Sequence, residues 1–178
     1  HVHCKISQYS KNIQSIRVDN READVVIGGD LIVTASEKTL NLANKFKSSL
    51  ICNDYELVTG DFTRNKDLTV NSKEIKSCLN SNFKKKSSWF INATELAKTY
   101  LGNSIYSNTV LLGYTFQSGL IPLKLSSLIS AIKQNYKNNE MNLYAFDLGR
   151  YLFLNNIDEL TSQNNNSIYD NLTKITDP

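Results

Sequence analysis

The sequence predicts a layered α/β domain. Three short, continuous apolar runs have the composition of buried parallel strands: residues 25–27, 50–52 and 89–91. Helices are indicated by apolar residues three and four positions apart, as at Leu125, Leu128 and Ile132. Strands that alternate with such helices along one chain are typical of an α/β architecture.

Size and charge narrow the class of protein. The chain has 178 residues, of which 40% are hydrophobic and 21% are charged, as expected for one ordinary globular domain. The formal net charge of +3 is too small to indicate nucleic-acid binding. No apolar run reaches the roughly 18 residues that a membrane span needs. We therefore expect neither nucleic acid nor a membrane as a partner.

The three cysteines are widely spaced, at Cys4, Cys52 and Cys78. They form no CxxC pair, so we expect neither a zinc site nor an iron–sulfur cluster in this chain. Their apolar neighbours favour small, buried thiols. Reduced cysteines, together with the absence of a visible signal peptide, predict a cytoplasmic protein.

Strand and helix signals follow one another in the first half of the chain. We expect strands at residues 2–7, 25–27 and 50–52, the second ended by glycines 28 and 29. Ser36 can cap a helix that runs to about Phe46. Residues 53–70 are rich in polar and turn-forming residues and predict a long loop, and loops of that length are often functional.

Capping boxes start two helices in the middle of the chain. Asn71 pairs with Glu74, and Asn92 pairs with Glu95. Gly102 should end the second of these helices. Further helices are expected at residues 105–117, 125–132 and 140–153, and a polar linker at 163–167.

No complete active site is visible in the sequence. His1 and His3 would share one face of a strand, but without a third ligand nearby no metal site is expected. Residues 28–30, Gly-Gly-Asp, follow a strand but lack the GxGxxG fingerprint, so a tight turn is favoured over a dinucleotide site. No carboxylate pair, GxSxG elbow or cysteine–histidine pair stands out. We therefore assign no catalytic residue.

Several segments form an ordered set. They are VHCKIS at 2–7, ADVVIGGDLIVTA at 23–35, Asn53 followed by DFTRN at 61–65, ATELA at 93–97, LGNSIYSN at 101–108, LLGYTFQSGLIPL at 111–123, AIKQN at 131–135 and AFDLGR at 145–150. In this order they resemble the gamma domain of the 2-oxoacid:ferredoxin oxidoreductases, the pyruvate/indolepyruvate ferredoxin oxidoreductase family. The loop at 61–65 is similar to that of the long, fused indolepyruvate type. The resemblance covers about residues 1–154, and residues 155–178 are expected to be a polar linker and C-terminal extension.

The resemblance implies a three-layer α/β/α sandwich with a mixed, mostly parallel sheet. It implies a place in an enzyme that oxidatively decarboxylates a 2-oxoacid, here an aryl pyruvate, passes electrons to ferredoxin and forms an acyl-coenzyme A. Thiamine diphosphate, Mg²⁺ and 4Fe–4S clusters are expected in other domains or subunits, with no cofactor in this segment. The segment itself would be non-catalytic. It would pack against the catalytic domains and, as in some relatives, help to receive coenzyme A.

Two departures from the family pattern affect the expected boundaries. The family domain opens with a glycine-rich strand–helix unit ahead of residues 2–7, and this sequence lacks that unit. We therefore expect a sheet short of one strand and one helix, with an edge that needs a partner. Lys124 stands where relatives often have a capping serine, so Ser126 is expected to cap the next helix instead.

Seven residues are candidates for ligand binding or a domain interface: Asn53, Thr63, Arg64, Asn65, Asn108, Gln117 and Arg150. An inward Asn108 needs a hydrogen-bond partner, and a loop backbone is favoured over a ligand. Arg64 could grip a phosphate or carboxylate through two hydrogen bonds, although an ion pair or subunit contact is favoured. Arg150, late in its helix, suits the helix dipole, which favours a structural role. Gly113 is expected to allow close helix packing.

Two other functions stay open at this point. The chain could be a stand-alone module that binds a nucleotide-like ligand, which stoichiometric binding by the isolated chain would support. It could also be a purely structural or assembly module. Within the oxidoreductase interpretation, assembly is the favoured role of this segment.

Overall fold

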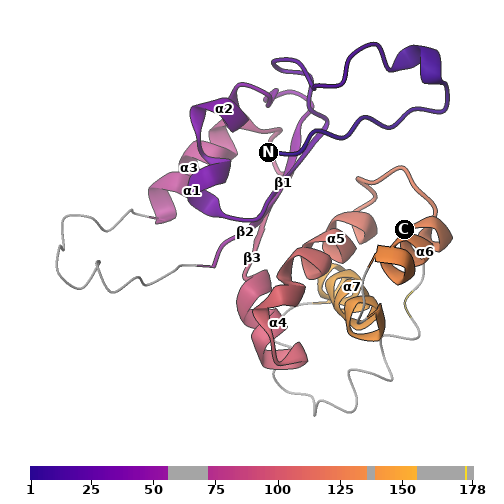
Figure 1. Ribbon diagram of the computed structural model, residues 1–178. Coiled ribbons are helices and arrows are strands. Elements are labelled where there is room, and N and C mark those ends of the chain that lie inside the picture. The colour runs from indigo at the N-terminus through magenta and orange to yellow at the C-terminus, as the bar shows by residue number, and fades with distance from the viewer. Residues whose placement is uncertain (56–71, 136–138, 156–174, 176–178) are drawn as a thin grey trace. The chain divides into compact units, whose positions relative to one another are not determined.

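The computed structural model describes residues 1–55, 72–135, 139–155 and 175. Most of the loop predicted at 53–70, and all of the linker predicted at 163–167, lie outside the described residues. The chain divides into two compact units, residues 1–91 and 92–178 (Figure 1). The domain predicted over residues 1–154 includes parts of both units.

The first unit is built on a three-stranded parallel sheet. Its strands are β1 (Val25–Gly28), β2 (Ser49–Asn53) and β3 (Ser88–Ile91), in the spatial order β1-β2-β3 (Figure 1). Every residue of β2 is buried, as expected for a central strand with a continuous apolar run. The three apolar runs are thus confirmed as strands, and the predicted α/β class is confirmed with them. All pairings among the described strands are parallel.

Three helices lie together on one side of this sheet (Figure 1). They are α1 (Leu31–Thr34), α2 (Glu37–Leu40) and α3 (Ser72–Asn82), and a 3₁₀ turn, η1 (Ser10–Asn12), precedes the sheet. Apolar side chains of the helices, the strands and the connections between them form one buried cluster: Leu31, Ala43, Leu50, Cys52, Leu79 and Phe83. The helix predicted to follow Asn71 is confirmed as α3.

The helix expected from Ser36 to about Phe46 is right in its start but wrong in its length. Ser36 occupies the N-cap position of α2, although its side chain makes no capping hydrogen bond, and α2 ends at Leu40. Two one-turn helices are present instead: α1 ends at Thr34, before this region, and α2 covers only Glu37–Leu40 of it. The first is started by Asp30, whose side chain accepts a hydrogen bond from the Val33 amide at 2.8 Å. Because Ser36 has extended backbone angles, the helical ladder is interrupted there and restarts in α2.

The early end of α2 has a local cause. Beyond Leu40, the amide of Leu42 bonds three residues back to the Thr39 carbonyl at 3.0 Å, which is the pattern of a tighter turn. The side chain of Asn44 then accepts a hydrogen bond from the Phe46 amide at 3.0 Å. Such a bond offers the backbone an alternative to the helix ladder, so the chain leaves the helix before Phe46.

The strand expected at residues 2–7 is also wrong, because these residues form no regular secondary structure. Their polar side chains bond to the returning chain. His3 Nδ1 accepts from the Val18 amide at 3.1 Å, and Lys5 Nζ donates to Ser15 Oγ at 2.5 Å. The alternation in the sequence is real, but side-chain bonds replace a backbone ladder.

The second unit is helical in its described part. Its elements are α4 (Ala93–Leu101), η4 (Ser104–Tyr106), α5 (Ser107–Gln117), α6 (Leu125–Asn135) and α7 (Asn139–Leu154). Phe116, Leu128, Ile132 and Phe146 form a buried cluster in this unit. The helices predicted from apolar periodicity are therefore confirmed, with small differences at their ends.

Close packing of α5 on α7 depends on two glycines. A β-carbon at Gly113 would collide with the carbonyl oxygen of Phe146. A β-carbon at Gly149 would collide with the carbonyl oxygen of Val110 and lie 2.7 Å from the Tyr114 nitrogen. The predicted role of Gly113 is confirmed, and Gly149 has the reciprocal role on the other helix.

The ends of α4 follow the sequence signals. Asn92 Oδ1 accepts a hydrogen bond from the Glu95 amide at 3.0 Å. Gly102 has a φ of 74°, the left-handed conformation that favours glycine after a helix. Both predicted end signals of this helix are confirmed.

The start of α6 differs from the prediction. The helix begins at Leu125, so Ser126 lies inside it and does not cap it. The amides of Ser127 and Leu128 bond to the Lys124 carbonyl at 3.0 and 3.3 Å. Lys124 therefore occupies the position that precedes the helix, and the expected shift to Ser126 is wrong.

Candidate functional site

Asn53 ends β2 at the carboxyl edge of the sheet, the edge at which α/β proteins usually bind ligands. The side chain is buried, and its Nδ2 donates to the carbonyl oxygen of Gly29 at 3.2 Å. This bond ties the end of β2 to the turn that follows β1. The predicted candidate Asn53 therefore shapes the carboxyl edge of the sheet.

An ion pair lies next to Asn53 on the same edge. Asp54 accepts a hydrogen bond from Lys76 Nζ at 2.7 Å, and both side chains are partly buried. The Lys76 ammonium also lies 5.6 Å from the centre of the Phe90 ring. The pair joins α3 to the strand ends, and each charge has a compensating partner.

Cys52 is buried beneath this edge and is not an available nucleophile. Its thiol donates to Thr34 Oγ1 at 3.6 Å, and burial raises the pKa of the thiol to about 11. Cys4 and Cys78, in contrast, are exposed. The expectation of buried thiols is therefore right for Cys52 and wrong for the other two, because neighbouring apolar residues in sequence do not guarantee a buried position.

A buried polar cluster lies in the second unit, where α5 packs on α7. Arg150 Nε donates to Gln117 Oε1 at 3.0 Å, and Arg150 Nη1 donates to Asp147 Oδ1 at 3.2 Å. Arg150 is only 4% exposed and Gln117 only 5%, so both polar groups need partners inside the protein. The guanidinium also lies 5.7 Å from the centre of the Phe116 ring. Two candidates chosen separately from the sequence are thus direct partners.

Asp147 is the carboxylate of this cluster. Burial raises the pKa of its carboxyl above the ordinary value, and the hydrogen bond and charge of Arg150 oppose that shift only in part. The side chain remains 33% exposed. Loss of hydration therefore has the largest effect on the pKa of Asp147, although the carboxylate also accepts a hydrogen bond from the Arg150 guanidinium.

Asn108 does not face inward as expected. It is exposed on α5, whereas its neighbour Thr109 is buried and donates to Asn142 Oδ1 at 2.9 Å. One residue corresponds to about 100° around a helix, so a small error in phase exchanges an exposed for a buried position. The Thr109–Asn142 bond links α5 to α7 and was not predicted.

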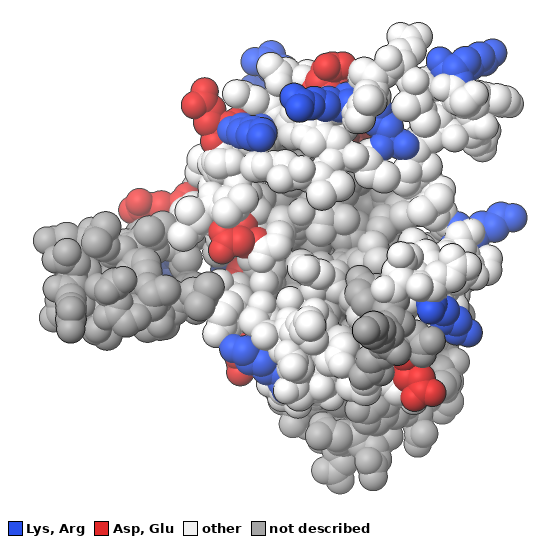
Figure 2. Space-filling model, in the orientation of Figure 1, with Lys and Arg blue, Asp and Glu red and all other residues white. Residues whose placement is uncertain are grey.

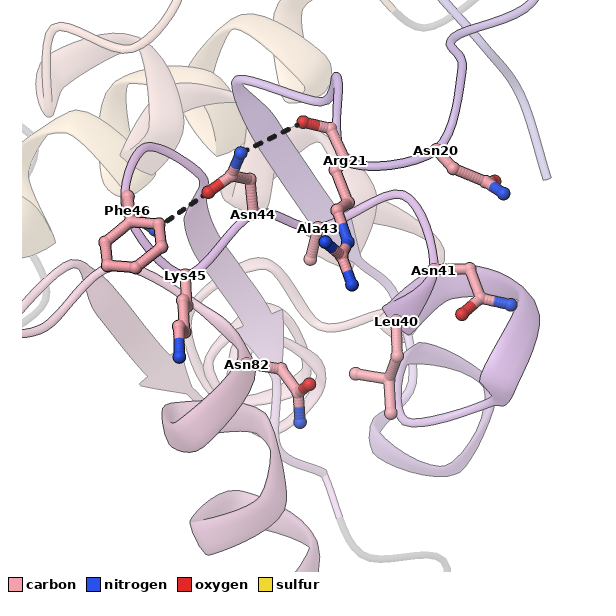
Figure 3. A pocket seen from close by; sticks show the side chains of 9 residues that line it. All are labelled: Asn20, Arg21, Leu40, Asn41, Ala43, Asn44, Lys45, Phe46 and Asn82. Carbon is pink, nitrogen blue, oxygen red and sulfur yellow. Dashed lines mark hydrogen bonds between the residues drawn. The ribbon is translucent and has the colours of Figure 1, made fainter.

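A surface pocket of about 520 Å³ lies in the first unit (Figure 3). Its lining comes from the turn before β1, the last residue of α2, the segment between α2 and β2, and the last residue of α3: Asn20, Arg21, Leu40, Asn41, Ala43, Asn44, Lys45, Phe46 and Asn82. These segments lead into the amino ends of the strands. The pocket is therefore at the sheet edge opposite to the one that carries Asn53.

The comparisons with known proteins identify the family of the chain. Residues 1–152 match the family described as Pyruvate ferredoxin/flavodoxin oxidoreductase. The chain belongs to this family. No curated protein and no solved structure matches the chain. The match confirms the 2-oxoacid:ferredoxin oxidoreductase family that the sequence segments resemble. Membership of this family implies that the chain is part of an oxidoreductase.

The described part of this oxidoreductase-family chain offers no ligand set for a metal or an iron–sulfur cluster. No three His, Cys, Asp or Glu side chains gather within it. His1 Nε2 lies 2.8 Å from Thr39 Oγ1, and His3 bonds to the Val18 amide.

Three of the candidates in this family member, Thr63, Arg64 and Asn65, lie outside the described residues.

No helix within the described ranges has the length and apolar character that crossing a membrane requires. Most of the face drawn in Figure 2 is neither basic nor acidic, and charged side chains of both signs occur on it.

Proposed function

We propose that the chain is the gamma-type, non-catalytic domain of a cytoplasmic 2-oxoacid:ferredoxin oxidoreductase of the indolepyruvate type. Its main role would be to assemble the enzyme. Thiamine diphosphate, Mg²⁺ and 4Fe–4S clusters would be held by other domains or subunits, where the oxidative decarboxylation takes place. The match of residues 1–152 to the oxidoreductase family is the observation that carries this proposal.

The use of the buried polar residues supports a structural role. Asn53 bonds to the backbone of Gly29, and Gln117 bonds to Arg150, so each described contact is made within its own unit. Catalytic groups must instead reach a substrate or cofactor with their reactive atoms. These side chains stabilise the two units from inside, as an assembly domain requires.

Exposed apolar side chains on the N-terminal segment support a docking role. Val2 is 97% exposed and Ile16 is 93% exposed, and Ile6, Tyr9 and Ile13 are exposed on the same segment. Because several exposed apolar side chains along one segment favour a protein contact, we propose that residues 2–16 bind the catalytic domains of the same oxidoreductase. Family membership supports this partner over an unrelated protein.

The finer chemistry is proposed from the resemblance to the gamma domain. An aryl pyruvate would be the 2-oxoacid, ferredoxin the electron acceptor and coenzyme A the acyl acceptor. Coenzyme A would be received at this domain, and Arg64 is the residue with the chemistry to hold one of its phosphates. These roles depend on the complete enzyme.

Charged substitutions on the N-terminal segment of the complete oxidoreductase test the assembly role. We expect the double substitution Val2→Asp with Ile16→Asp to dissociate the enzyme in size-exclusion chromatography and to lower turnover in parallel. Ile105→Asp is a matched control, because Ile105 is 73% exposed but lies outside the segment. Full assembly of the double variant would reject the docking segment. Full assembly and turnover of an enzyme that lacks residues 1–154 would reject the proposed function itself.

A further inference from the structure

The pocket in the first unit combines two basic side chains with several carboxamides. Arg21 and Lys45 line it together with Asn20, Asn41 and Asn82, and the lining contains no Asp or Glu. In Figure 3 the side chains of Arg21 and Lys45 point the same way, toward the side of the pocket where Asn82 lies. The lining therefore has positive charge and hydrogen-bond donors without a carboxylate to compensate them.

Nearby acidic residues are engaged by a different cation. Lys47 Nζ lies 3.6 Å from a Glu22 carboxylate oxygen and 3.2 Å from an Asp24 carboxylate oxygen. Within the described residues, the side chain of Arg21 makes no ion pair or hydrogen bond. The ammonium of Lys45 lies 5.2 Å from the centre of the Phe46 ring and forms no ion pair or hydrogen bond with another described residue. Both lining cations are thus available to an anionic ligand.

The backbone of Arg21 is held in an unusual conformation. Its φ is 62°, in the left-handed region that a non-glycine residue seldom adopts. Two hydrogen bonds fix it: the Arg21 amide donates to the Asn41 carbonyl at 2.9 Å, and Asn44 Nδ2 donates to the Arg21 carbonyl at 3.3 Å. Glycine would adopt this φ without strain, so the arginine contributes something other than turn geometry.

We propose that this pocket binds a phosphate group, either free phosphate or the phosphate of a small metabolite's monoester. The Arg21 guanidinium offers paired donors that match phosphate oxygens, and Lys45 adds a second positive charge. The carboxamide of Asn41 is exposed and supplies further donors. A volume of about 520 Å³ accommodates a ligand larger than phosphate alone.

An ester would find an apolar surface in the same pocket. Leu40, Ala43 and Phe46 line it beside the cations, and Phe46 is 78% exposed. An aromatic or apolar group attached to the phosphate would cover these side chains. The site lies at the amino ends of the strands, away from the usual ligand edge, and is therefore independent of the function proposed above.

Titration of the full chain tests the site, with ³¹P NMR line width as readout and ionic strength held constant with chloride. The probes are inorganic phosphate and phenyl phosphate, with phenol as the uncharged comparison. We expect saturable binding of both phosphates. Because phenol has no phosphorus, it is added as a competitor, and we expect it not to displace phenyl phosphate. Tighter binding of phenyl phosphate would assign the site to monoesters, whereas equal affinity would assign it to free phosphate.

Two substitutions separate binding from folding. Arg21→Gly removes the cation but relieves the left-handed strain, so we expect at least about a tenfold loss of affinity with unchanged or higher thermal stability. Lys45→Met should also weaken binding about tenfold. Lys133→Met is the charge-matched control, because Lys133 is an exposed lysine of α6, and it should bind like the unchanged chain. No saturable binding, or equal affinity of the Arg21→Gly variant and the control, would overturn the proposal.

Discussion

Arg150 on α7 and Gln117 on α5 form a hydrogen bond of 3.0 Å in the interior of the second unit, from Nε to Oε1. A guanidinium that is 4% exposed has little access to water, so the protein must supply its partners. Gln117 and Asp147 do so from two helices. The pair therefore links α5 to α7. Removal of either side chain would leave the other buried without this hydrogen bond.

The first prediction concerns this pair. Gln117→Met removes the acceptor of the Arg150 Nε and should lower the free energy of unfolding by about 1–3 kcal/mol. Arg150→Met should cost about as much or more, since it leaves both Gln117 and Asp147 without this donor. The double variant should recover part of the loss, because two apolar side chains of similar volume leave fewer unsatisfied groups.

Urea unfolding of the two single variants and the double variant measures this coupling. The control is Lys98→Met, because Lys98 lies 4.0 Å from Glu95 in a largely exposed ion pair. Its loss should change the free energy of unfolding by less than about 1 kcal/mol. Strictly additive single and double changes would contradict the proposed linkage of the two helices.

The second prediction concerns the glycines between α5 and α7. Alanine normally stabilises a helix interior by about 1 kcal/mol relative to glycine. Gly113→Ala and Gly149→Ala should instead destabilise the protein by about 1–3 kcal/mol, since each new β-carbon would meet backbone atoms of the other helix. Thermal unfolding measures the sign. Ser127→Ala, at an exposed position of α6, should have little effect. A stabilising Gly113→Ala variant would show that the helices can separate at no cost.

The third prediction concerns the titration of Asp147. Its pKa is raised by burial, so the folded protein holds this proton more tightly than the unfolded chain does. The contribution of this group to stability is therefore largest below the unfolded pKa of about 3.9 and declines as the pH rises through the folded pKa. Asp147→Asn keeps an acceptor for Arg150 and removes the titration. The stability of the variant relative to the unchanged protein should increase with pH across that window in urea unfolding, and a decrease would mean that Arg150 dominates over desolvation.

The fourth prediction concerns thiol reactivity. Cys4 and Cys78 are exposed, whereas Cys52 is buried with its pKa raised to about 11. Iodoacetamide at pH 8 should therefore modify two cysteines in the folded protein and all three in urea. Peptide mass spectrometry identifies the sites. Modification of Cys52 in the folded protein at the same rate as Cys78 would contradict its buried position beneath the sheet edge.

Local signals predicted much of the fold where one physical effect dominates. The apolar runs that became β1, β2 and β3 were recognisable because a buried parallel strand has few polar residues. Asn92 and Gly102 mark the ends of α4 through their own backbone bonds and conformation. Such features depend on neighbours in sequence, so they can be inferred without knowing the tertiary structure.

The predictions fail where side-chain hydrogen bonds replace those of the backbone. They also fail where the rotation of a helix about its axis decides which residue is buried. Residues 2–7 alternate like a strand, but His3 and Lys5 bond to the returning chain instead. The expected helix after Ser36 stops early because of local turns. Asn108 is exposed, and the buried polar residue is Thr109, one position away on the same helix.

The site was only partly predictable for a similar reason. Gln117 and Arg150 were both chosen, but the contact between them depends on the approach of α5 to α7. Gly113 and Gly149 carry a signal for that approach, since Gly113 lies about one turn before Gln117 and Gly149 immediately precedes Arg150. The pocket at the amino ends of the strands depends on the left-handed turn at Arg21, which no sequence pattern marked.

We propose above all that this chain works inside a large oxidoreductase that carries its cofactors elsewhere. Isolation of the native polypeptide with an antibody to this chain tests it directly, when intact mass, thiamine diphosphate and iron are measured on the same sample. We predict a polypeptide or complex far larger than 20.1 kDa that contains both thiamine diphosphate and iron. A free protein of 20.1 kDa with neither cofactor would contradict the claim and favour a stand-alone binding module.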